Sequence, residues 1–338
     1  MELNKKLYLI CNAKRSVGFG HLSRCLCIAK QLRNTFKIYF AGDFSEDAIS
    51  IIRENSFPIL RYDLLTGKDG IAIIDLMFDE ENANFYDKER IGFISQHFKK
   101  TILLSSADTV PGDLPVDIVV GYLLKPSENG NYSFKSFPGL EYAPIPIDFT
   151  DRRLERREIR DRINRVFICF GGWKNIDGPL LVLDTLREIN FSGMVDVLLS
   201  PLQSEYQDML KAYGSTFRTR IHCNVPSIAP LLNEADLAIG TYGHIVFESL
   251  CLGTPFIVIG VKDFQVSYAK NLEKEGFLVC GGKLGKINRH DIHDAILSMD
   301  REQRQQLSNK GRHHIDTNGI IRITNIIREE TQIEPRGR

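Results

Sequence analysis

Short apolar runs alternate with amphipathic stretches along the first half of the chain. The apolar runs are rich in Ile, Val and Leu, which is typical of strands buried in a parallel sheet. They predict strands at residues 7–12, 37–41, 59–62, 71–76, 101–105 and 117–121. Between them, apolar residues recur at helical spacing and predict helices at 21–33, 46–55 and 82–98. Strands that alternate with helices indicate an α/β fold with helices on both faces of the sheet.

The second half of the chain repeats this alternation after a break in the pattern. Strands are predicted at 166–171, 195–199, 220–223, 237–239, 255–259 and 278–280, and helices at 179–189, 205–213, 227–233, 245–252 and 266–275. Two doubly wound domains in tandem would place a ligand in a cleft between them.

The domain boundaries follow from the break. We expect an N-terminal Rossmann-like domain at 1–150 on the sugar and catalytic side, and a C-terminal nucleotide-binding domain at 165–317. Residues 151–164 alternate in charge, which favours a solvated linker over a binding surface. A last helix at 318–330 is expected to pack back on the first domain.

Composition narrows the class of protein. The 338 residues carry 43 basic and 43 acidic side chains, so no polyanion-binding surface is implied and nucleic acid is not an expected partner. The seven cysteines are scattered through apolar segments without a C-x-x-C pair, which favours reduced thiols over disulfides or zinc. The first residues hold only a brief apolar run, so neither a signal peptide nor stable membrane insertion is expected. These features predict a soluble, cytoplasmic protein.

The turn between the first strand and the first helix is the leading candidate site. It contains Gly18, Gly20 and His21, and a helix that starts there presents free N–H groups and the positive end of its dipole to an anion. His21 could act as a base or orient a water, with Arg24 one turn later as a fixed cation. The alternative is an ordinary turn with a capping histidine. Neither the dinucleotide fingerprint nor a P-loop is present, since Ser23 replaces the third glycine and no Gly-Lys-Ser/Thr follows.

Other strand ends carry further candidates. Asp75 ends one apolar run, at the edge of a parallel sheet where ligands bind, so it is a candidate catalytic residue that could contact a sugar, or it could simply cap a turn. Gly171 and Gly172 form a second glycine-rich turn, and Gly243 with His244 forms a third. Glu248 follows on an otherwise apolar helix and could hold a ribose diol, or be a helix acid favoured by the dipole.

Taken together, several motifs resemble one enzyme family. The segments GFGHLSR, FGGWKN, GTYGHIVFESLCLGTPFIVI and DTNGIIRI resemble the nucleotide-sugar hydrolase of pseudaminic acid biosynthesis, which acts on UDP-2,4-diacetamido-2,4,6-trideoxy-β-L-altropyranose. The wider group includes spore-coat polysaccharide proteins, and a more distant relative is the lipid-II N-acetylglucosaminyltransferase. The resemblance covers nearly the whole chain. It implies the GT-B architecture, with two Rossmann-like domains, and a reaction that needs neither metal nor cofactor.

The resemblance also implies roles for individual residues. His21 would activate the water that attacks the anomeric carbon, with inversion. Gly171 and Gly172 would approach the diphosphate, Gly243 and His244 would lie near the phosphates, and Glu248 would contact the ribose. Gln265 matches the last position of the family's Glu-Asn-Gln motif, which reads Asp263-Phe264-Gln265 here, and would contact the nucleotide or its phosphates. The family usually has an acidic pair after the strand at 101–105, whereas this chain reads Ser105-Ser106-Ala107-Asp108 there. Trp173 follows the glycine pair at a position where the family usually has a small residue. Both departures bear on the identity of the substrate more than on the fold.

Three functions are therefore considered. The first is hydrolysis of a UDP-(diacetamido-trideoxy)hexose to UDP and free sugar, for nonulosonic acid or surface polysaccharide biosynthesis. The second is a glycosyltransferase of the same fold, in which an acceptor hydroxyl replaces water and Phe264 and Trp173 supply an apolar wall. The third is an inactive nucleotide-sugar-binding protein, which the intact Gly-Phe-Gly-His sequence disfavours.

Overall fold

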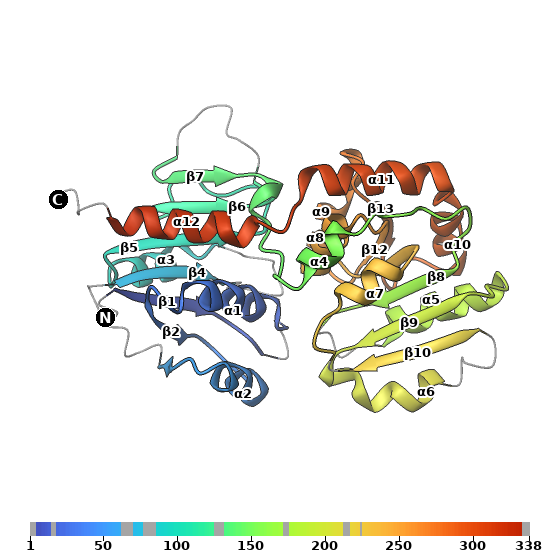
Figure 1. Ribbon diagram of the computed structural model, residues 1–338, viewed down its shortest axis with the longest axis horizontal. Helices are drawn as coiled ribbons and strands as arrows, with labels where there is room; N and C mark the ends of the chain where they lie inside the picture. Colours follow the sequence, from blue (N-terminus) through green and yellow to red (C-terminus); the bar gives the residue numbers. More distant parts are fainter. Residues whose placement is uncertain are drawn as a thin grey trace. The chain divides into compact units, whose positions relative to one another are not determined.

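The computed structural model describes residues 5–14, 18–61, 70–76, 86–124, 132–171, 176–211, 217–223 and 225–332. The chain divides into two compact units. Unit 1 combines Met1–Pro146 with Asn318–Arg338, and unit 2 is the continuous segment Ile147–Thr317. Each unit has its own parallel sheet and its own apolar core (Figure 1).

Unit 1 is built on a seven-stranded parallel sheet in the order β3-β2-β1-β4-β5-β6-β7. Its central strands are buried on both faces, because helices cover both sides of the sheet. The strands are β1 (Lys6–Cys11), β2 (Lys37–Ala41), β3 (Ile59–Leu60), β4 (Gly70–Asp75), β5 (Lys100–Ser105), β6 (Ile118–Gly121) and β7 (Lys135–Pro138).

The helices of unit 1 are α1 (Gly20–Leu32), α2 (Glu46–Glu54), α3 (Lys88–Ser95), a 3-10 turn at Leu140–Tyr142 and, from the end of the chain, α12 (Gly319–Gln332). Four isoleucines of α12 lie in the same apolar core as α1, and Figure 1 shows α12 lying along the sheet of this unit. Glu330 near the end of α12 pairs with Lys100 and, at 3.1 Å, with Lys135. The last helix is therefore an integral part of unit 1.

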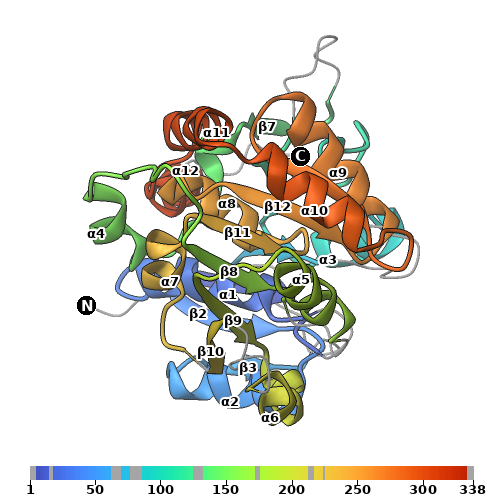
Figure 2. The ribbon, with the colours of Figure 1, turned by 90° about the vertical axis from the view of Figure 1, so that its right-hand side faces the viewer.

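Unit 2 is built on a six-stranded parallel sheet in the order β10-β9-β8-β11-β12-β13 (Figure 2). The strands are β8 (Arg165–Cys169), β9 (Met194–Leu199), β10 (Arg218–Cys223), β11 (Leu237–Gly240), β12 (Phe256–Gly260) and β13 (Val279–Lys283). The helices are α4 (Phe149–Leu154), α5 (Asp177–Glu188), α6 (Gln207–Lys211, after a 3-10 turn at Pro201–Tyr206), α7 (Ala229–Glu234), α8 (His244–Leu252), α9 (Asp263–Lys274), α10 (Arg289–Ser298) and α11 (Arg301–His314).

Two parallel α/β sheets are what the hydrophobic pattern predicts, and this fold class is confirmed. Three elements were not predicted, namely β7, α10 and α11. Strand β7 is a short edge strand that ends in a proline, so it lacks the apolar run of a central strand. In α11 the buried positions include Arg304, Ser308 and Gly311, which leaves almost no apolar periodicity to detect.

The charged stretch 151–164 differs from the predicted solvated linker. It belongs to unit 2, where α4 takes its first four residues. The Arg157 side chain donates hydrogen bonds to the carbonyls of Asn233 and Ala235, and Arg160 pairs with Asp236 at 2.8 Å. These arginines therefore bond to backbone carbonyls at the end of α7 and to the buried Asp236, and are not solvated on all sides. The predicted helix at 82–98 is described only from Tyr86 onward, where α3 lies within it.

In the described part of the chain, no helix combines the length and the apolar character that a bilayer-spanning helix requires.

Candidate functional site

The turn between β1 and α1 brings a glycine-rich backbone to the carboxyl edge of the unit 1 sheet. Gly18 has a φ of +77°, a left-handed conformation that favours glycine, and its N–H donates to the carbonyl of Lys14 at 2.8 Å. Helix α1 then starts at Gly20, and Phe19 at its N-cap provides no side-chain acceptor for the first N–H groups. Gly18 and Gly20 therefore form the backbone turn that the sequence predicted for an anion.

His21, Arg24 and Asp75 meet at this edge. His21 and Arg24 lie one turn apart on α1, and Asp75 is the last residue of β4, which pairs with β1 so that Asp75 lies beside Cys11. Arg24 donates two hydrogen bonds to the Asp75 carboxylate, from Nε to Oδ2 at 2.9 Å and from Nη2 to Oδ1 at 2.7 Å. The Nδ1 atom of His21 lies 2.7 Å from Asp75 Oδ1 and 2.8 Å from Arg24 Nη2.

All three residues are buried, so the charges of Arg24 and Asp75 depend on each other. Burial raises the pKa of Asp75, but the charge of Arg24, with His21 beside it, outweighs burial and holds that pKa well below its usual range. Burial likewise opposes the charge on Arg24, while Asp75 raises the Arg24 pKa above its ordinary value. The pair is therefore fully ionised and nearly neutral as a whole.

This ion pair sets the chemistry of the histidine. An ionised carboxylate accepts a hydrogen bond from a protonated Nδ1, which leaves the lone pair of Nε2 free to take a proton from a reactant. Arg24 Nη2 can only donate, so it favours the opposite tautomer, and the two neighbours compete for Nδ1. Nε2 has no hydrogen bond to any residue in the described part of the chain.

Asp75 was predicted as a possible sugar contact, and its geometry gives it a different role. Both of its oxygens are already engaged by Arg24 and His21, and the side chain is only 2% exposed. Its carboxylate instead holds the His21 ring and the Arg24 guanidinium in place. Tyr122 was not predicted from the sequence as a site residue. It directly follows β6 at the same sheet edge and lies buried within electrostatic range of Arg24. Burial raises the pKa of its phenol.

Unit 2 carries two glycine turns on neighbouring strands. Gly171 follows β8 with a φ of +67°, and Gly240 at the end of β11 lies beside Cys169 of β8. Gly172 lies outside the described residues. Gly243 precedes α8 with extended backbone, and a Cβ added there would contact nothing within 4 Å. No described side chain caps the start of α8, which begins at His244, so the N–H groups of its first turn are candidates to bind an anion.

Glu248 lies one turn after His244 on α8 and is 8% exposed. Burial, with Asp148 adding to it, raises the pKa of its carboxyl group to about 8. Among the residues that the structure describes, none forms a hydrogen bond with this group. A buried carboxyl without partners is costly unless a ligand supplies donors, so Glu248 has the properties of a binding residue.

Gln265 was predicted as a ligand contact, but its side chain is tied to the protein backbone. Its Oε1 accepts from the N–H groups of Val261 and Lys262 at 2.8 and 3.0 Å and from the Thr241 hydroxyl at 3.1 Å. Its Nε2 donates to the carbonyl of Tyr242 at 2.9 Å. Gln265 therefore fixes the turn before α8 against the turn before α9.

A separate hollow of about 490 Å³ lies in unit 2 between the start of α5 and the loop after β13. None of the predicted site residues lines it; its walls are Asp177, Leu180, Leu181, Asp184, Val261, Leu284, Gly285, Ile287 and Arg289.

Comparison with solved structures places this chain in the GT-B fold. MurG of Acinetobacter baumannii matches with a TM-score of 0.66 at 14% identity, over 96% of this chain and 99% of that one. The spinosyn rhamnosyltransferase SpnG, solved with thymidine diphosphate, matches with a TM-score of 0.63 at 12% identity, over 96% of this chain and 100% of its own.

Sequence comparison adds distant relatives. The UDP-2,4-diacetamido-2,4,6-trideoxy-β-L-altropyranose hydrolase of Campylobacter jejuni is 26% identical over 81% of this chain and 98% of its own length. An uncharacterized protein of Methanocaldococcus jannaschii is also 26% identical, over 95% of this chain, which spans 66% of that protein's length. The spore coat polysaccharide biosynthesis protein SpsG of Bacillus subtilis is 31% identical over 30% of this chain and 31% of its own. No protein-family model matches the chain. The protein thus has a GT-B fold and a distant similarity to a nucleotide-sugar hydrolase.

Proposed function

We propose that this protein hydrolyses a UDP-(diacetamido-trideoxy)hexose to UDP and a free sugar, with inversion at the anomeric carbon. The product class would serve nonulosonic acid or surface polysaccharide biosynthesis. The observation that carries the proposal is the buried His21–Asp75–Arg24 group, in which an ionised carboxylate lies 2.7 Å from the histidine Nδ1. The similarity to the Campylobacter hydrolase over nearly that enzyme's whole length supports the same reaction class.

In the proposed mechanism, His21 acts as the general base. The Asp75 carboxylate accepts a hydrogen bond from the Nδ1–H of His21, and Nε2 takes a proton from a water molecule as the water oxygen bonds to the anomeric carbon. The bond from that carbon to the β-phosphate oxygen breaks on the opposite side, and UDP leaves with the electron pair. Arg24 keeps Asp75 ionised, so the imidazolium that forms is stabilised by a nearby negative charge.

Unit 2 would bind the nucleotide. The uncapped start of α8 at Gly243 and His244 offers N–H groups and a positive dipole end to the diphosphate, which stabilises the leaving group. Gly171 would allow the backbone to approach the phosphates. The carboxyl group of Glu248, which bonds to none of the described residues, would hydrogen-bond with the ribose hydroxyls.

The test is proton NMR of the purified protein with a panel of UDP-diacetamido-trideoxyhexoses and no acceptor. We expect UDP and free reducing sugar in equal amounts, with the inverted anomer first. The reaction should proceed equally in EDTA, since every group in the proposed mechanism belongs to the chain. Substrate that binds without release of sugar would contradict hydrolysis.

A glycosyltransferase is the second candidate, favoured by one local feature. Phe264 at the start of α9 is half-buried, with its ring 6.0 Å from that of Tyr268, and Tyr268 lies 5.7 Å from Tyr242. An aromatic wall beside the turns of α8 and α9 would suit an acceptor and exclude water. Release of UDP only after an acceptor is added would establish this reaction. Binding without turnover under any condition, unaffected by His21→Ala, would instead indicate an inactive binding protein.

A further inference from the structure

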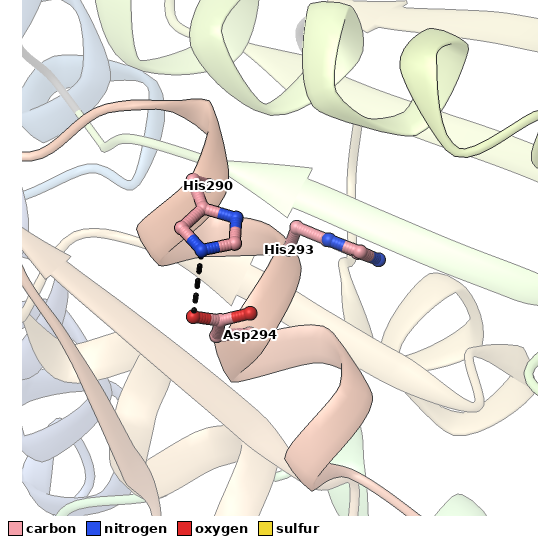
Figure 3. A group of neighbouring side chains, drawn as sticks. All are labelled: His290, His293 and Asp294. Atoms are coloured by element: carbon pink, nitrogen blue, oxygen red, sulfur yellow. Dashed lines mark ion pairs between the residues drawn. The ribbon is translucent and has the colours of Figure 1, made fainter.

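Three potential metal ligands gather on the solvent side of α10. His290, His293 and Asp294 each offer one ligand atom, and these atoms lie within 4.8 Å of one another. Figure 3 shows the imidazole of His290 facing the carboxylate of Asp294, with Nε2 and Oδ2 3.6 Å apart, and His293 on the adjacent turn. It is the one group of three or more His, Cys, Asp or Glu side chains with this spacing found in the described residues.

The backbone that carries these side chains is held firmly at both sides. Asn288 caps the helix, because its Oδ1 accepts from the N–H of His290 at 2.8 Å, while the Asp291 carboxylate accepts from the N–H of Asn288. Arg289 ties the first turn to α5 through Asp184 at 2.9 Å. The opposite face of α10 is buried in the unit 2 core through Ile292, Ala295 and Ile296.

Helical spacing explains why the three side chains converge. Residues three and four positions apart stand on the same face of a helix, about one turn from each other. A metal ion about 2.0–2.2 Å from each ligand atom requires those atoms to be closer together than the observed limit. His290 and Asp294 are 79% and 60% exposed, so small side-chain rotations in water can close this gap at low cost.

We propose that this face of α10 binds one divalent transition-metal ion of the zinc class. His290 and His293 would each supply an imidazole nitrogen, Asp294 would supply a carboxylate oxygen, and water would fill the remaining positions. Two nitrogens and one oxygen suit zinc, nickel, copper or cobalt, whereas magnesium and calcium prefer sites made of oxygen ligands alone. The ligands take no part in the proposed hydrolysis, so this site is independent of that proposal.

The test is calorimetric titration of the whole chain with zinc chloride, after treatment with EDTA and desalting into chelator-free buffer. We expect one ion per chain. His290→Ala, His293→Ala and Asp294→Asn should each weaken binding at least roughly tenfold, since each removes one of three protein ligands. None of the three residues is buried, so each variant should keep the fold, and thermal melting without metal checks this for each variant.

The matched control is His313→Ala with His314→Ala on α11, which also removes two exposed histidines but leaves the cluster intact. This variant should bind zinc as the parent protein does. The proposal fails if the parent binds no zinc, or if the three cluster variants bind as tightly as the parent, which would place the ion at a cysteine. A loss confined to His290 and Asp294 variants would overturn the three-ligand assignment, and magnesium binding as tight as zinc binding would overturn the metal class.

Discussion

Asp75 is a buried carboxylate that neutralises Arg24 and also bonds to His21, and substitutions can test these two roles. Asp75→Asn leaves the Arg24 charge buried without its partner, so we expect a loss of about 3–5 kcal/mol in the free energy of unfolding. It also removes the acceptor that holds the proton on His21 Nδ1, so turnover should fall by roughly 10²-fold or more. Chemical denaturation and steady-state kinetics measure the two effects.

The double variant Asp75→Asn/Arg24→Gln provides the control. It removes both charges, so much of the stability should return, but the histidine remains without its carboxylate and turnover should stay low. Full recovery of turnover in the double variant would show that Asp75 only neutralises Arg24.

His21 itself gives the second prediction. His21→Ala should lower turnover by roughly 10²-fold or more while UDP binding changes little, because the nucleotide contacts are assigned to unit 2. His97→Ala is the matched control, since His97 is a partly exposed histidine of the same unit whose ring bonds to the Phe93 carbonyl, away from Asp75 and Arg24. Kinetics and UDP titration on both variants decide the point; near-normal turnover in His21→Ala rules out a general base at this position.

Glu248 makes the stability of the protein depend on pH in an unusual direction. Burial raises its pKa to about 8 in the folded state, against an ordinary value near 4.5. Between these values the folded state holds a proton that the unfolded state has lost, so this residue makes the free energy of unfolding fall as pH rises. Glu248→Gln removes the effect. Its melting temperature should therefore match the parent at pH 4.5 and exceed it at pH 8.5, by an amount equivalent to a few kcal/mol.

Thermal melting at several pH values measures this difference. Glu158→Gln is the control, because Glu158 is an exposed acid of the same unit. An equal response of both variants at every pH would show that Glu248 is not protonated in the folded protein.

At the scale of elements, the sequence predicts well wherever burial leaves a simple pattern. The run that became β1 is buried along almost its whole length, and the glycine turn and His21 follow it directly, so both strand and site were visible. Roles that depend on long-range contacts were not. The sequence around Asp75 does not reveal that its carboxylate is already bonded to Arg24. Nor does the sequence around Gln265 reveal that its amide oxygen is already bonded to the N–H groups of Val261 and Lys262.

Helix α12 gives a prediction at this scale, because it joins the core of unit 1 from the far end of the chain. Ile327 is fully buried there, so Ile327→Ala should cost unit 1 about 2–5 kcal/mol of stability. Ile321 lies on the same helix with 37% of its surface exposed, and Ile321→Ala should cost much less. Hydrogen exchange should show lost protection in the strands of unit 1 for Ile327→Ala, with unit 2 unchanged. Equal loss in both units would contradict separate cores.

At the scale of the whole molecule, the two units differ in how the chain builds them. Unit 2 is one continuous segment with its own apolar core, whereas unit 1 needs both ends of the chain. A sheet with its covering helices and a complete core satisfies the requirements for independent folding. The segment 147–317 expressed alone should therefore fold cooperatively.

That fragment also separates binding from chemistry. It retains Gly171, Gly243 and Glu248, so UDP affinity should be close to that of the whole chain, measured by calorimetry, and Glu248→Ala should weaken it by roughly 1.5–3 kcal/mol. It lacks His21 and Asp75, so no sugar should be released from any UDP-sugar. If the folded fragment binds no UDP while the whole chain does, unit 1 must supply nucleotide contacts, and the assignment of the nucleotide to unit 2 fails.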